Sequence, residues 1–153
     1  MQRVRQQLMI LAATMLPAFA FANAAAHASG RTYTARTTWD SVYSGDQATR
    51  GESTYAKTCS RCHKAALGGA DEAPALTGGA FMGSWNGQTL HDLHDRIRTT
   101  MPTDTPGTYS RQDIADVIAY VLKFNQFPAG KTELPSAEEE LKTITWVSAK
   151  PAN

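Results

Sequence analysis

The sequence predicts an all-α domain of three to four helices connected by long loops. Two segments, near 90–99 and 111–124, repeat apolar residues at helical spacing directly after capping patterns. Strand-like alternation of apolar and polar residues is weak along the whole chain. The chain has 153 residues, which is room for one compact domain, and its hydrophobic share of 42% is ordinary for a globular protein.

Residues 1–24 are predicted to be a secretory signal peptide that is not part of the fold. A short basic leader precedes an apolar run from Leu8 to Phe21, and small-residue patterns of the Ala-x-Ala type follow. We expect cleavage after Ala24. The alternative is an uncleaved membrane anchor, but the run is shorter than the ~20 residues of a spanning helix and Pro17 interrupts it. After cleavage we expect no membrane span.

The mature chain is predicted to open with an extended, Thr-rich segment at 25–43. Ser44 or Asp46 can then cap a first helix from about 47 to 58. Gly51 inside this helix costs about 1 kcal/mol relative to alanine. Close approach of another helix is the expected compensation. Residues at helical spacing share one face: Ala48, Gly51, Tyr55 and Cys59.

Residues 65–87 are predicted to be a loop, because they contain seven glycine and proline residues. A loop of this length without structure of its own is expected where it binds something. A helix at about 90–99 follows, with a capping pattern at its start. Met101 stands directly before Pro102, so its backbone should be extended just beyond this helix.

The last long helix is predicted from about Arg111 to Phe124, and Pro128 and Gly130 end it. We take residues 44–130 as the main domain and 131–153 as a tail packed on it. A short helix near 136–143 is expected in the tail, which Trp146 can pin to the domain. The apolar stripe of the long helix is Ile114, Val117, Ile118, Val121 and Leu122.

Charge and cysteine content narrow the function. The formal net charge of +1 gives no case for nucleic acid as a partner. The only two cysteines lie in Cys59-Ser60-Arg61-Cys62-His63. A disulfide would close a very short loop and add little stability, and a thioredoxin-like pair needs a strand–turn–helix setting that the flanking sequence lacks.

Two interpretations of the motif involve a metal. A structural zinc site usually needs four ligands, so His91 and His94 would have to complete the set. Covalent haem attachment is what Cys-x-x-Cys-His specifically indicates. Two thioethers can reach the two vinyl groups on one porphyrin edge, and His63 then lies beneath the iron. Haem of this kind is attached outside the cytoplasm, which agrees with the predicted export. We therefore expect one haem c, bonded to Cys59 and Cys62.

Three motifs carry a family resemblance: Gly51-x-x-x-Tyr55-x-x-x-Cys59-x-x-Cys62-His63, Pro74-Ala75-Leu76-x-Gly78 and Met101-Pro102. With them, residues 47–125 resemble class I (monohaem) c-type cytochromes. The resemblance implies the small cytochrome c fold, with long loops wrapped around one haem. It implies that Met101 is the distal iron ligand and that the Pro74 carbonyl accepts a hydrogen bond from the proximal imidazole. It also implies that Gly51 faces Tyr120 on the last helix.

A closer resemblance rests on loop and tail motifs: Trp39-x-x-Val-Tyr43, Ile97-Arg98-x-x-Met101-Pro102 with Pro106-Gly107, and Phe127-Pro128-Ala129-Gly130-x-x-Glu133-Leu134-Pro135. These are similar to bacterial periplasmic cytochromes found with quinoprotein (PQQ-dependent) dehydrogenases. The chain departs from them at Ser41, where related chains often carry glycine. The resemblance implies a periplasmic carrier rather than an enzyme. Its partners would be redox proteins, with a dehydrogenase as donor and an oxidase or another cytochrome as acceptor.

The distal ligand has four candidates in the mature chain. Met101 is favoured by its position before proline and by the family match. Met82 is equally explained as a gap-filler of the core. We expect His91 to be solvated and His94 to be a partly buried histidine with a hydrogen-bond partner. A thioether ligand opposite an imidazole would raise the reduction potential relative to two histidines.

Other residues are candidates for haem contact, each with a plainer alternative. Leu76, Ile97 and Val117 are expected to form walls of the pocket. The Trp85 indole can reach a propionate or serve only in packing, and Pro74 can be only a turn proline. Arg61 and Lys64 either steer a partner or are ordinary solvated charges.

Two further functions stay open on the sequence. A haem sensor or peroxidase-like protein would need a labile distal position, so Met101 discriminates it. A cytochrome subunit or docking module of a larger dehydrogenase would use the segments before residue 44 and after residue 130. A monomer and a subunit of a complex are both compatible with the sequence.

Overall fold

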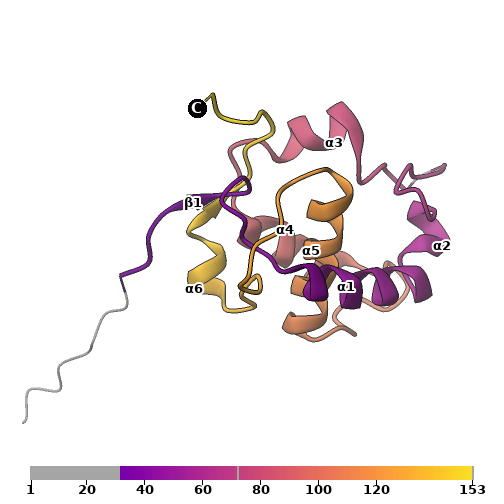
Figure 1. The fold of residues 1–153 in the computed structure, drawn as a ribbon. Coiled ribbons are helices and arrows are strands. Elements are labelled where there is room, and N and C mark those ends of the chain that lie inside the picture. Colours follow the sequence, from indigo (N-terminus) through magenta and orange to yellow (C-terminus); the bar gives the residue numbers. More distant parts are fainter. Residues whose placement is uncertain (1–31, 72, 153) are drawn as a thin grey trace, which may run out of the picture. The chain divides into compact units, whose positions relative to one another are not determined.

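Helices α1 and α5 form the frame of the fold, and α4 packs beside them (Figure 1). The computed structural model describes residues 32–71 and 73–152, so the predicted signal peptide and residues 25–31 lie outside it. Residues from Thr32 onward form one compact unit; the boundaries predicted at 44 and 130 stay predictions. The elements are β1 (Arg36–Thr37), α1 (Gly45–Lys57), α2 (Ser60–His63), α3 (Gly78–Trp85), α4 (Leu90–Thr100), α5 (Arg111–Phe124), α6 (Glu138–Leu141) and β2 (Ile144–Thr145).

The predicted all-α class is confirmed, and the longer helices begin at local capping signals. Ser44, not Asp46, caps α1, because its hydroxyl accepts a hydrogen bond from the Gln47 N–H at 3.1 Å. Helices α4 and α5 each begin with a reciprocal capping box, Thr89 with Asp92 and Ser110 with Asp113. Each cap satisfies backbone N–H groups that the first helical turn leaves unpaired.

The close approach expected at Gly51 is confirmed. A Cβ atom at this position would lie 1.8 Å from the carbonyl oxygen of Asp116 on α5, so only glycine fits there. The α5 atoms nearest to such a Cβ belong to the backbone of Asp116 and Val117, and that Gly51 faces Tyr120 stays a prediction. The Tyr120 ring packs on Tyr55, one helical turn further along α1, with 5.2 Å between ring centroids.

The prediction of an unbroken loop at 65–87 is wrong, because α3 forms within it. Phe81 from α3 is buried, and its ring contacts the fully buried Trp146 of the tail with 5.6 Å between centroids. Tertiary burial of this kind overrides the low helix propensity of glycine. With the one-turn helices α2 and α6, the count rises above the three to four helices expected.

The tail is pinned to the domain by Trp146, as the sequence predicts. Its backbone N–H donates to the Gln88 carbonyl at 2.7 Å, and its ring also packs on Phe127. A two-residue parallel sheet, unexpected from the sequence, pairs Arg36 with Ile144 and Thr37 with Thr145. Such short strands carry no readable alternation. The short helix expected at 136–143 is limited to α6.

Ser41 stands at the position where related chains often carry glycine, and the backbone explains the preference. Its φ is 51°, in the left-handed region that favours glycine. Gly130 lies against it, because a Cβ there would come within 2.3 Å of the Ser41 carbonyl oxygen. The Gly130 N–H donates to the Tyr43 carbonyl at 2.6 Å. This close contact joins the segment before α1 to the start of the tail.

None of the helices in the described part of the chain is both long enough and apolar enough to cross a membrane.

Candidate haem-binding site

The two cysteines and His63 lie on a single helical turn that follows α1. The Cys59 carbonyl accepts hydrogen bonds from the N–H groups of Cys62 at 3.2 Å and His63 at 2.9 Å. The two thiols are not joined in a disulfide. Cys59 is half-buried, and this burial raises the pKa of its thiol, whereas Cys62 is exposed. One helical turn therefore carries both thiols and the imidazole.

The His63 ring is oriented by the backbone of the following loop. Its Nδ1 lies 2.8 Å from the carbonyl oxygen of Pro74. A carbonyl can only accept, so Nδ1 carries a proton, and in the neutral ring Nε2 then keeps its lone pair. A neutral imidazole with a free Nε2 is the form that binds a metal, and the carbonyl makes it a better donor.

Gly69 brings the Pro74 carbonyl to His63, a role that sequence reasoning missed. Its φ is +70°, and a Cβ there would lie 2.4 Å from the carbonyl oxygen of Ala73. The Gly69 N–H also donates to the His63 carbonyl at 3.0 Å. The glycine pair at 68–69 could have indicated a close backbone contact. The sequence does not show that this contact is with residues 73–75 of the same loop.

Tyr55 anchors the chain just after the motif. Its hydroxyl donates to the Lys64 carbonyl at 2.8 Å, and Lys64 has a φ of 61°. Burial raises the pKa of Tyr55 above its ordinary value, so the phenol stays protonated and can donate. The turn that carries His63 is thus tied at one side to α1 and at the other to the loop.

The predicted wall residues come from separate elements. Leu76 follows the Pro74 segment, Trp85 ends α3 and Ile97 lies on α4; all three are half-buried and pack against the core. Val117 on α5 is buried. Leu76 is held at both backbone groups: its N–H donates to the Leu67 carbonyl at 2.7 Å, and its carbonyl accepts from the Asn125 side chain at 2.9 Å.

Met101 directly follows the last residue of α4, with the extended backbone that the sequence predicts. Its φ is −124° and its ψ is 146°, and its N–H still donates to the Ile97 carbonyl at 2.9 Å. The side chain is half-buried. The end of α4 therefore fixes the backbone position from which the Met101 side chain extends.

The rival ligands have other roles in the structure. His94 is fully buried, more than expected, and its Nε2 lies 3.0 Å from the Arg111 carbonyl at the start of α5. His91 is not solvated as expected: its side chain is only 20% exposed, and Nε2 lies 3.8 Å from a Glu138 oxygen. Helix α6 covers it, which the sequence around His91 does not reveal. Met82 packs on the core, and its carbonyl accepts from Ser148.

The donor set fits haem better than zinc. Among the described residues, no group of three or more His, Cys, Asp or Glu side chains is placed to hold a metal ion. A thiol pair followed by one oriented imidazole, with half-buried apolar side chains nearby, suits a group that is bonded at one edge and ligated through its metal.

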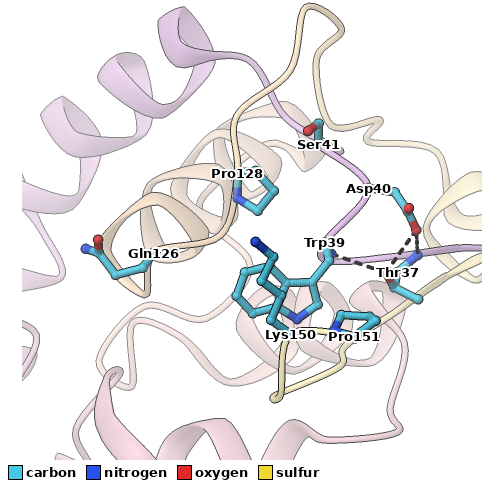
Figure 2. A pocket seen from close by; sticks show the side chains of 8 residues that line it. All are labelled: Thr37, Trp39, Asp40, Ser41, Gln126, Pro128, Lys150 and Pro151. Atoms are coloured by element: carbon cyan, nitrogen blue, oxygen red, sulfur yellow. Dashed lines mark hydrogen bonds between the residues drawn. The ribbon is translucent and has the colours of Figure 1, made fainter. Parts of the chain in front are cut away.

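A shallow hollow of about 480 Å³ lies elsewhere, between the segment before α1 and the tail (Figure 2). Figure 2 shows Asp40 turned onto Thr37, where its carboxylate accepts from the backbone N–H at 2.6 Å and from the hydroxyl at 2.9 Å. None of the predicted haem contacts lines this hollow, which is bounded by Thr37, Trp39, Asp40, Ser41, Gln126, Pro128, Lys150 and Pro151.

Comparison with known proteins shows what this helical fold with its oriented imidazole is similar to. Residues 46–121 match the family described as cytochrome c oxidase, cbb3-type, subunit III. Over these residues the chain is similar to the c-type cytochromes, a family that binds haem. This is a class of electron carriers rather than, typically, of enzymes.

Among solved structures, the chain is similar to the sulfane dehydrogenase SoxCD from Paracoccus pantotrophus. The sequences are 22% identical and the TM-score is 0.41. The match covers 57% of this chain and 52% of that one, so the chain spans about half the length of the protein it matches. No curated protein matches the chain.

Proposed function

We propose that this chain is a periplasmic monohaem cytochrome that passes single electrons between redox partners. Haem iron, when bound, supplies a one-electron couple. In this proposal Cys59 and Cys62 hold the group covalently, and His63 and Met101 are the axial ligands. The observation that carries the proposal is the 2.8 Å contact between His63 Nδ1 and the Pro74 carbonyl, which directs a free Nε2 away from the backbone.

The remaining residues set the properties of the couple. The Pro74 carbonyl strengthens His63 as a donor, and the Met101 thioether favours the reduced iron and so a higher potential. Leu76, Ile97 and Trp85 would limit the access of water, and a low local dielectric also tunes the potential. With both axial positions taken, no open position is left for a substrate.

The partners are proposed from the family resemblance. The donor would be a dehydrogenase, a quinoprotein among the candidates, and the acceptor a terminal oxidase or another cytochrome. Exposure of Arg61 and Lys64 supports contact at the attachment side, because these charged side chains are open to another protein. The same face would serve a free carrier or a subunit docked in a larger dehydrogenase.

Covalent attachment is tested by producing the chain in a host that matures c-type cytochromes. We expect the mass of the exported protein to exceed that of its polypeptide by one haem, and Cys62→Ala to leave only one thioether, which shifts the pyridine haemochrome spectrum. Ser60, which lies between the two cysteines, offers a matched control, since Ser60→Ala should leave mass and spectrum unchanged. Recovery of the bare polypeptide would refute the proposal.

The distal ligand is tested by Met101→Ala, with Met82→Ala as the matched control. Loss of the thioether should lower the reduction potential by more than ~59 mV, a tenfold change in a one-electron equilibrium. It should also remove the long-wavelength absorption of the oxidised methionine complex. An unchanged spectrum and potential in Met101→Ala would favour the sensor or peroxidase-like alternative with a labile distal position.

A further inference from the structure

The loop that follows Met101 is held against the segment that carries the cysteines. Residues 102–110 connect α4 to α5, and 103–108 are exposed. Their internal hydrogen bonds are short-range, such as Thr105 N–H to the Pro102 carbonyl at 3.0 Å. Segments of this kind, with few buried contacts, open at low free-energy cost. What restrains the loop must therefore come from outside it.

Two side-chain contacts join this loop to the attachment segment, among the hydrogen bonds and ion pairs of the described residues. The hydroxyl of Tyr109 hydrogen-bonds the hydroxyl of Thr58, and Asp104 pairs with Arg61 at 3.1 Å. Thr58 immediately precedes Cys59, and Arg61 lies between the two cysteines. Both contacts therefore link the distal loop to the backbone that anchors the proximal side.

The two contacts differ in strength. Tyr109 and Thr58 are half-buried, and the Tyr109 ring packs against the core. Opening the loop would separate this pair and expose the ring to water. Arg61 and Asp104 are 63% and 58% exposed, so their attraction is screened by solvent and salt. The Tyr109–Thr58 pair is thus the main restraint.

We propose that Tyr109 and Thr58 form a latch that keeps Met101 in place on the iron. The inference rests on the proposed function, in which Met101 is the distal ligand. Tyr109 and Thr58 are positioning residues in this scheme: they act on the loop, and Met101 is the group that contacts the iron. Opening the latch allows an added ligand to replace Met101 at the distal position. A stronger latch therefore lowers the apparent affinity for that ligand.

The test is a titration of the oxidised holoprotein with imidazole, followed by loss of the methionine absorption. Tyr109→Phe keeps the ring and removes the hydroxyl. We expect it to raise imidazole affinity about fivefold, which corresponds to about 1 kcal/mol at 1.4 kcal/mol per tenfold. Thr58→Val should give a similar rise, with its haem content measured because it adjoins Cys59. The double variant should also rise only about fivefold, since both changes remove one hydrogen bond.

Tyr43→Phe is the matched control, because it also deletes a tyrosine hydroxyl that makes a hydrogen bond. Tyr43 donates to the Phe127 carbonyl at 2.7 Å, at the contact between the segment before α1 and the residues after α5. It should lower global stability and leave imidazole affinity unchanged. Equal rises in Tyr43→Phe and Tyr109→Phe would mean general loosening and would overturn the latch. An unchanged affinity in Tyr109→Phe, or multiplied effects in the double variant, would overturn it as well.

Met101→Ala separates failure of the latch from failure of the proposed function. With no thioether to displace, it should bind imidazole more tightly than any latch variant. If it does and Tyr109→Phe behaves as the wild type, the latch is wrong and the ligand assignment stands. If Met101→Ala leaves the affinity unchanged, the ligand assignment itself fails and the latch fails with it.

Discussion

The contact between α1 and α5 and the segments around His63 are built in opposite ways. At Gly51 the two helix backbones approach so closely that no side chain fits between them, and most of α5 is buried. His63 ends the one-turn helix α2, the chain that follows it is loop, and Leu76 in that loop is half-buried. The α1–α5 contact is therefore tightly packed and leaves no room for a bound group. The segments around His63 instead offer backbone carbonyls and partly exposed apolar side chains to such a group.

The largest expected effect breaks the frame. Gly51→Ala places a methyl group against the Asp116 carbonyl, where two helix backbones would have to separate. We expect a loss of about 3 kcal/mol in the free energy of unfolding, the upper range for overpacking. Urea denaturation of the holoprotein measures it.

Gly45→Ala on the same helix is the matched control for this change. No atom lies within 4 Å of a Cβ built at Gly45. Its effect on unfolding should stay within about 0.5 kcal/mol. Similar losses in the two variants would mean that the close approach at Gly51 is not what limits this position.

A smaller effect concerns the way α4 joins the frame, which depends on a titratable group. Burial lowers the pKa of His94, and repulsion from the nearby Arg111, His91 and Arg98 side chains lowers it further, against the opposing hydrogen bond to the Arg111 carbonyl. A histidine with a depressed folded-state pKa is neutral in the fold. Its contribution to stability is complete above the unfolded pKa of about 6.5 and is lost as the pH falls below that value.

The measurement compares wild type and His94→Gln by urea unfolding at pH 7.5 and pH 5.5. The wild type should lose up to about 1.4 kcal/mol per pH unit below 6.5 from this group. The variant lacks the titrating ring and should lose less. A difference between the two proteins that is the same at both pH values would contradict this account of the α4–α5 contact.

The smallest expected effect concerns the ion pair between the loop after Met101 and the segment that carries the cysteines. Asp104→Asn removes the exposed ion pair with Arg61 and leaves the Tyr109–Thr58 hydrogen bond intact. Imidazole affinity should change less than about twofold at low salt and not at all at high salt, because exposed pairs contribute little and are screened. A rise as large as that in Tyr109→Phe would transfer the main restraint from the hydroxyl pair to the ion pair.

The structure also separates what could be predicted about the site from what could not. The extended backbone at Met101 follows from the proline after it, and both capping boxes are visible as spacings of three residues. The roles of Gly69 and of the Tyr109–Thr58 pair were not visible. Each depends on a loop returning to a distant backbone position, and no local pattern encodes such a return.

By itself the sequence determined the helices α1, α4 and α5, the motif of two thiols and an imidazole, and the need for close approach at Gly51. These are consequences of neighbouring residues, because capping, helical spacing and backbone freedom act within a few positions. Only the tertiary structure decided that Gly51 meets Asp116, that a glycine-rich segment becomes α3, and that α6 covers His91. Those outcomes depend on burial against segments far along the chain, and burial outweighs local preference.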